Sequence, residues 1–191
     1  MRLKIGFFTV MLALSLCLTP SLLSLSALLA ALLHELGHLG MARLCGVRLR
    51  ECRIGIYGAG LVPDGSVYSY GQEILLCLAG PLVNLFCFLV AVWLRQGGTE
   101  SFWNAFCFSS FALGALNLLP IKGFDGGRIL HALLSLMLSP RGAARLCEAV
   151  SFVGILLLWC LSVYLLLRTV SSLSLFVFSL SLFARIFLSE E

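Results

Sequence analysis

Charged side chains are scarce in this chain. Of its 191 residues, 12% are Asp, Glu, Lys or Arg, whereas 60% are hydrophobic. A soluble globular domain is about 25% charged, so the composition excludes an ordinary soluble enzyme and a disordered segment. The net charge of +4 rests on 13 scattered basic residues, too few for a surface that tracks phosphates, so no nucleic-acid partner is expected. We expect an integral membrane protein whose surroundings are the lipid bilayer.

Long stretches of the sequence lack Asp, Glu, Lys, Arg and His altogether. They cover residues 5–33, 74–94, 101–121 and 149–167, with a shorter stretch at 169–184. A bilayer core needs about 20 helical residues, so one helix over 5–42 would be about twice too long, and Pro20 is its natural break. The pattern therefore predicts an all-α polytopic membrane protein with about six transmembrane helices. We expect a single membrane-embedded domain over 1–191.

One motif places ionisable residues inside an apolar helix. His34-Glu35-Leu36-Gly37-His38 lies at the end of the second predicted span. Residues four apart share a helix face, so both imidazoles can reach one metal ion. Glu35 is adjacent to the first histidine, where it can take a proton from a water at the metal. Because unpaired ionisable groups are costly inside a membrane, the motif favours a metal site over satisfied core histidines.

The basic residues indicate how the chain crosses the membrane. Arg2 precedes the first predicted span, Arg43 follows the second and Arg141 precedes the fifth. The positive-inside rule places these ends, and with them both termini, in the cytosol. His34 is nine residues before Arg43, which is about 13 Å of helix. The predicted site therefore lies in the cytoplasmic half of the bilayer.

A third metal ligand is expected from another segment. A catalytic zinc usually has three protein ligands, and Asp125 is the remaining acid beside an apolar stretch. Pro120 and several glycines interrupt that stretch, and irregular backbone at membrane depth is tolerated where it lines a cavity. The alternative is that Asp125 caps a helix starting near Gly126. His131 lies off the face of any residue next to Asp125, so we expect it to pack in the core or support a ligand.

The long polar interval between residues 43 and 73 predicts a small β-hairpin at the membrane surface. Residues 53–62 alternate around several glycines, Pro63-Asp64-Gly65 is a turn signal, and residues 66–70 would form the second arm. The edge of such a hairpin can pair with an extended substrate. A solvated structural loop is the alternative.

Three motifs in order along the chain resemble the site-2 protease family of intramembrane zinc metalloproteases. They are the HELGH helix, Ala79-Gly80-Pro81-Leu82-Val83-Asn84, and Asn117-x-x-Pro120 followed by Asp125-Gly126. The resemblance covers roughly the whole chain and is to the branch that contains stage IV sporulation protein FB in particular. It implies His34, His38 and Asp125 as the ligands of one Zn²⁺ per chain, and Glu35 as the catalytic acid–base residue. It also implies a six-span core, a membrane-tethered protein substrate and a bacterial cell membrane.

The chain departs from that family in two places. Gly123-Phe124 stand where the family often has Pro-Leu, and the sequence ends at Glu191 without the cystathionine-β-synthase domain common in the sporulation branch.

The resemblance favours a site role for Asn117, as a hydrogen-bond donor to the tetrahedral oxyanion, with packing as the alternative. Asn84 is expected to hydrogen-bond across helices.

Two other functions compete with a protease. A metal-binding membrane transporter should spread polar residues along several spans and often shows inverted repeats. An inactive pseudoprotease scaffold should lack the glutamate or a ligand, and all four residues are present here. Hydropathy leaves open whether residues 127–138 complete the fourth span or lie re-entrant. No motif selects a substrate or a regulatory membrane partner.

Overall fold

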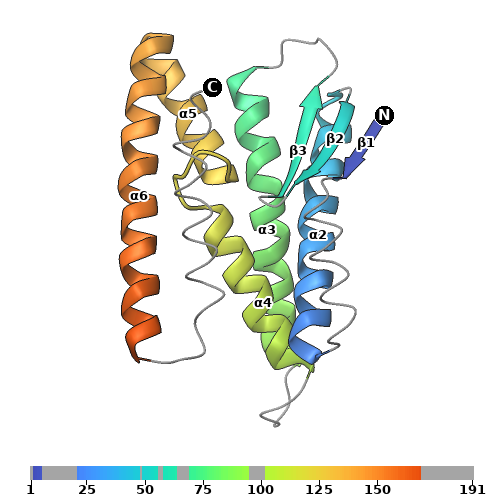
Figure 1. Cartoon of the computed structure of the whole chain (residues 1–191). Coiled ribbons are helices and arrows are strands. Elements are labelled where there is room, and N and C mark those ends of the chain that lie inside the picture. The colour runs from blue at the N-terminus through green and yellow to red at the C-terminus, as the bar shows by residue number, and fades with distance from the viewer. Residues whose placement is uncertain are drawn as a thin grey trace.

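The computed structural model describes residues 2–5, 21–47, 49–55, 58–63, 69–94 and 102–168. Within these ranges the elements are β1 (Arg2–Ile5), α2 (Leu22–Leu44), β2 (Leu49–Gly55), β3 (Gly58–Pro63), α3 (Tyr70–Leu94), α4 (Phe102–Asn117), α5 (Asp125–Met137) and α6 (Pro140–Arg168) (Figure 1). Three of the described helices, α2, α3 and α6, are long and apolar enough to cross a membrane. The chain is a multi-pass membrane protein. The prediction of about six spans stays a prediction, because residues 6–20 and 169–191 lie outside the described part.

Helix α2 carries its small and polar residues on one face. Ser21 caps its N-terminus and accepts a hydrogen bond from the Ser24 N–H at 3.0 Å, in a capping box. The buried residues recur every fourth position: Ser26, Ala30, His34, His38 and Ala42. The leucines on other faces are exposed, among them Leu25, Leu32 and Leu36. Such a distribution suits a helix that turns its leucines to lipid, and it places both histidines against neighbouring helices.

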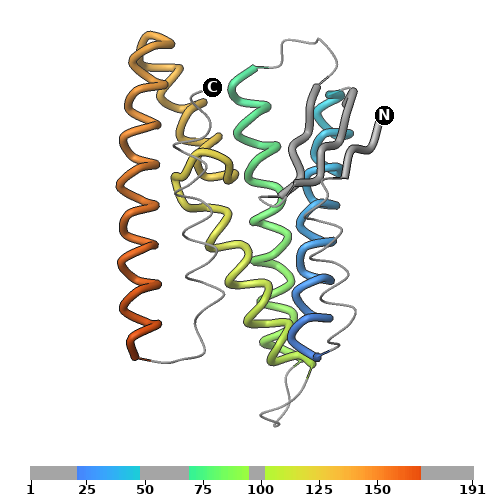
Figure 2. The backbone as a smooth tube through the Cα atoms, in the orientation of Figure 1, coloured from blue at the N-terminus to red at the C-terminus, as the bar shows by residue number. Residues whose placement is uncertain are grey.

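Helices α2, α3 and α4 pack on one another as a three-helix unit (Figure 2). Small residues allow the close approach of α2 to α3: a Cβ added at Gly37 would lie 2.8 Å from the Ala79 carbonyl oxygen. Ser26 of α2 and Ser109 of α4 share a buried hydrogen bond of 3.0 Å. The unit thereby fixes the His34–His38 face of α2 against α3.

The fourth hydrophobic segment is interrupted at mid-height of the bundle. Helix α4 ends at Asn117, residues 118–124 are not helical, and α5 begins at Asp125. Pro120 cannot donate to a helical ladder, and Gly123 has a φ of 108°, a conformation that favours glycine. In Figure 1, α5 continues from the break toward the end of the bundle where α6 begins. After the break, α5 therefore runs on in the direction of α4 and does not turn back along it (Figure 1).

The loop of the break is held from two sides. Phe124 and Ile121 are buried against Ile155 of α6, so the Gly123-Phe124 departure has a structural use: the glycine turns the chain and the phenylalanine anchors it. Gly126 and Gly127 lie so close to loop carbonyls that an added Cβ would collide with them. The first turn of α5 is therefore pressed against the loop, which fixes the position of Asp125.

The strands form one sheet with the order β1-β2-β3, in which β1 precedes α2 in the chain and β2 and β3 follow it. β1 pairs with β2 in parallel, and β2 pairs with β3 antiparallel, from Leu49 opposite Pro63 to Gly55 opposite Gly58. The predicted turn at Pro63-Asp64-Gly65 is therefore wrong, because β2 and β3 connect between Gly55 and Gly58. Residues 53–62, predicted as one arm, are divided between the two strands. Most of the predicted second arm, namely residues 66–68 of 66–70, lies outside the described residues. A run of glycines offers several possible turns, so alternation alone does not fix the register.

Candidate metal centre

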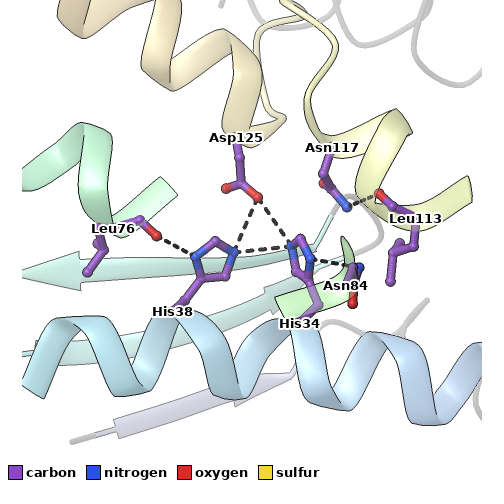
Figure 3. A network of polar contacts seen from close by, with 7 residues as sticks. All are labelled: His34, His38, Leu76, Asn84, Leu113, Asn117 and Asp125. Atoms are coloured by element: carbon purple, nitrogen blue, oxygen red, sulfur yellow. Dashed lines mark hydrogen bonds and ion pairs between the residues drawn. The ribbon is translucent and has the colours of Figure 1, made fainter. Parts of the chain in front are cut away.

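The structure brings three potential metal ligands from two segments into contact. His34 and His38 project from α2, and Asp125 projects from the first turn of α5 (Figure 3). Asp125 Oδ2 lies 3.2 Å from Nε2 of His34 and 3.2 Å from Nε2 of His38. The two Nε2 atoms are 3.1 Å apart. All three residues are buried, with exposed fractions of 4%, 4% and 8%.

This triangle of ligand atoms fits one face of a zinc tetrahedron. Zinc binds imidazole nitrogen and carboxylate oxygen at about 2.0–2.1 Å, so tetrahedral ligands lie about 3.3–3.4 Å apart. The observed sides of 3.1 and 3.2 Å are close to that spacing. Two imidazoles and one carboxylate are also a donor set that zinc uses in catalytic sites, with the fourth position open. The residues present therefore fit a zinc ion.

Each histidine is held at its other ring nitrogen. Nδ1 of His38 lies 2.7 Å from the Leu76 carbonyl oxygen, which can only accept, so Nδ1 carries the proton and Nε2 presents a lone pair. Nδ1 of His34 lies 3.1 Å from the side-chain nitrogen of Asn84. Both partners belong to α3 (Figure 3). Groups of this kind orient metal-binding imidazoles.

Gly80 of α3 forms the wall behind both imidazoles. A Cβ added there would lie 2.5 Å from Nε2 of His38 and 2.8 Å from Cε1 of His34. Such distances are far inside normal contact, and α3 runs so close only because residue 80 has no side chain. Pro81 follows Gly80 inside α3 and has no backbone N–H, so one main-chain hydrogen bond of the helix is missing next to the imidazoles.

Asp125 does not act as the cap of α5. The cap position is Phe124, without a side-chain hydrogen bond, and Asp125 is the first helical residue with its carboxylate turned to the histidines. The capping alternative therefore receives no support. His131 is exposed on α5, so the expectation that it packs in the core is wrong. It does not belong to the group of possible metal ligands found among the described residues.

Glu35 and Asn117 flank the cluster in different ways. Glu35 is partly exposed, and helix geometry places it about 60° around α2 from His38. Asn117 ends α4 beside the break, where its side-chain N–H donates to the Leu113 carbonyl at 3.0 Å. One of its two N–H hydrogens is used in this way, and a second remains.

The sequence predicts the supporting groups of α3 only in part. The expected hydrogen bond of Asn84 across helices is confirmed by its contact with His34 of α2. No motif predicts that the partner is a possible metal ligand, or that Gly80 contacts the imidazoles. The Leu76 carbonyl has no sequence signature, because any residue supplies one. For Asn84 a signal exists: it is an amide within the charge-free stretch 74–94, and a buried polar group inside a membrane needs a partner.

Comparisons with known proteins find relatives of this chain. The profile of peptidase family M50 matches residues 93–161, a range that includes Asp125. Stage IV sporulation protein FB of Bacillus subtilis is 31% identical over 163 residues, which are 83% of this chain and 57% of that protein. A zinc metalloprotease of Methanocaldococcus jannaschii is 31% identical over 117 residues, 56% of this chain and 32% of that protein. The chain thus spans between about a third and three fifths of these curated relatives.

A solved structure shares the fold. The site-2 protease from Methanocaldococcus jannaschii superposes with a TM-score of 0.61 over 95% of this chain and 88% of that chain, at 23% sequence identity. At this level of identity the likeness concerns the arrangement of the helices.

Proposed function

The chain belongs to peptidase family M50, the site-2 proteases, and from this premise we propose that it is an intramembrane zinc metalloendopeptidase. It would hydrolyse a peptide bond within or near the transmembrane segment of a membrane-tethered protein. The observation that carries the proposal is the convergence of His34, His38 and Asp125 from two segments on one point. A single zinc ion per chain would be held there.

The division of labour follows from the position of each side chain. His34, His38 and Asp125 would hold the zinc ion, which would supply a Lewis acid for the scissile carbonyl and for the attacking water. Glu35 accepts the proton of the attacking water and passes it to the leaving amine. Asn117 donates its remaining side-chain N–H to the developing oxyanion. A substrate segment that has lost its own helical bonds would lie beside the non-helical loop over 118–124, since irregular backbone at membrane depth is tolerated where it lines a cavity.

The rival functions receive less support. A transporter pathway needs polar groups at successive depths, whereas the only group of possible metal ligands among the described residues is this one. An inactive scaffold would have no need for Glu35 beside an intact ligand set.

We assign the protein to the cell membrane of a bacterium, as one membrane-embedded domain with about six spans and both termini in the cytosol. The site then lies in the cytoplasmic half of the bilayer.

The experiment that tests the proposal is the zinc content of the detergent-purified protein. We expect one zinc per wild-type chain and well under half of that in Asp125→Ala, because two imidazoles alone hold the ion weakly. His131→Ala is the matched control: the same helix loses an exposed titratable group six residues beyond Asp125, and its zinc content should equal that of the wild type.

The results separate the parts of the site. Full zinc in Asp125→Ala would leave the histidine pair as the only binding group and would remove α5 from the site. A wild type without zinc, purified in the absence of chelators, would contradict the proposed activity. A His131→Ala variant without zinc would show that the loss reflects disturbed packing of α5.

The sheet offers a place for the unwound substrate. β3 pairs with β2 alone, so one of its edges is open among the described strands. An extended segment can add to such an edge through main-chain hydrogen bonds. In this arrangement the hairpin lies at the membrane surface and presents the substrate to the metal centre.

Leu61→Pro in β3 tests substrate pairing. The variant removes one N–H donor, and a main-chain hydrogen bond is worth about 1 kcal/mol, so kcat/KM on a single-span reporter protein should fall about fivefold or more. Leu61→Val keeps the donor and should match the wild type. Cleavage kinetics unchanged by the proline would exclude strand addition at β3.

A further inference from the structure

Asn84 is the most deeply buried polar side chain beside the metal centre. It lies on α3, one helical turn beyond Gly80, and has no exposed surface. One end of its carboxamide is 3.1 Å from Nδ1 of His34 (Figure 3). The oxygen at the other end has no hydrogen-bond partner among the described residues. His34 is therefore the group that determines which end of the carboxamide faces the ring.

The chemistry of His34 decides the orientation. Its Nε2 faces Asp125 and His38, so Nε2 must present a lone pair to bind a metal. A neutral imidazole then carries its proton on Nδ1, and the neighbour of Nδ1 must accept it. The side-chain nitrogen of Asn84 cannot accept, whereas its oxygen can. The oxygen and the nitrogen of the carboxamide have nearly the same size and exchange places when the amide group rotates by 180°. Which of the two atoms faces the ring is assigned from the hydrogen-bond network.

The Asn84 side chain is tightly packed on the side of α4. Gly114 of α4 faces it, and a Cβ added at Gly114 would lie 3.2 Å from the Asn84 Cβ. The side chain is thus confined between α4 and the ring of His34. His38 differs, since its Nδ1 partner is a main-chain carbonyl that no substitution removes. Of the two histidines, only His34 is therefore oriented by a side chain that a substitution can change.

We propose that Asn84 is a positioning residue, whose side-chain oxygen accepts the Nδ1–H of His34 and keeps Nε2 of His34 directed at the zinc. The proposal rests on the zinc site of the proposed function. It extends the site by a residue that touches neither metal nor substrate. Loss of such a supporting partner lowers metal affinity by about 10- to 100-fold.

The test compares the zinc Kd of four detergent-purified full-length proteins by competition with a chromophoric chelator. Asn84→Leu keeps the volume and removes the acceptor, so its Kd should rise about 10- to 100-fold. Asn84→Asp keeps an acceptor at the same place and should restore a Kd near that of the wild type. Ser109→Ala removes another buried interhelical hydrogen bond, away from the ligands, and should leave the Kd unchanged.

Each outcome decides a separate point. A wild-type Kd in Asn84→Leu would overturn the positioning role while the zinc site stands. Equal weakening in Asn84→Leu and Asn84→Asp would also overturn it, because an acceptor would then not be what the site needs. Weakening in Ser109→Ala of the same size would assign the effect to bundle packing. A wild type that binds no zinc would defeat the proposed function and this inference together.

Discussion

Glu35→Gln is expected to lower the rate of peptide hydrolysis by about 10²- to 10⁴-fold, the usual contribution of a general base. The amide has the shape of the carboxylate but cannot accept the proton of the attacking water. Zinc content should remain at the wild-type level, because the ligand atoms of the buried cluster belong to other residues. Single-turnover cleavage of single-span reporter proteins, measured beside zinc per chain, tests both statements.

Glu148→Gln is the matched control for this substitution. Glu148 is an exposed acid on α6 that pairs with Lys122 at 3.4 Å, so the chemical change is the same and the residue lies on another helix than the histidines. Its cleavage rate should equal that of the wild type. Turnover near the wild-type rate in Glu35→Gln would show that another group moves the proton. Joint loss of zinc and activity would instead make Glu35 part of the ligand set.

The convergence of two histidines and one aspartate was largely predictable because its signals are local. A spacing of four residues places His34 and His38 on one helix face whatever surrounds them. Asp125 follows a proline–glycine interruption of an apolar run, and such a break in a membrane marks a cavity. Ionisable and helix-breaking residues are unfavourable inside a lipid bilayer, so each of these residues stands out in an otherwise apolar stretch. The succession of long apolar stretches along the sequence likewise indicates a bundle of helices.

The missed features depend on how separate elements meet. That Gly80 lies behind the imidazoles follows from the register of α3 against α2, which no single helix encodes. The pairing of Arg2–Ile5 with β2 joins residues about fifty positions apart, and loop closure over such a distance leaves no local pattern. The hairpin turn was misplaced because Gly55 and Gly58 are as suitable for a turn as Gly65. Side-chain periodicity cannot choose between turns when the strands are rich in glycine.

Gly80→Ala is expected to abolish zinc binding almost completely, a larger loss than removal of one ligand. The added methyl group would lie 2.5 Å from Nε2 of His38 and 2.8 Å from Cε1 of His34, so both rings must move or α3 must withdraw. Withdrawal of α3 would also carry away the Leu76 carbonyl and Asn84, which hold the two Nδ1 atoms. Either response separates the ligand atoms beyond the spacing of about 3.3 Å that zinc requires. Zinc per chain and thermal unfolding in detergent are the measurements.

Gly40→Ala provides the control within the motif helix itself. Gly40 is two residues beyond His38, and a Cβ added there meets nothing within 4 Å. The same substitution should therefore leave zinc content unchanged, and it should stabilise α2 by about 1 kcal/mol, the difference in helix propensity. Full zinc in Gly80→Ala would mean that α3 does not press on the imidazoles, and the wall assigned to Gly80 would be wrong. Zinc loss with an unchanged unfolding transition would place the effect of the methyl group at the ligands alone.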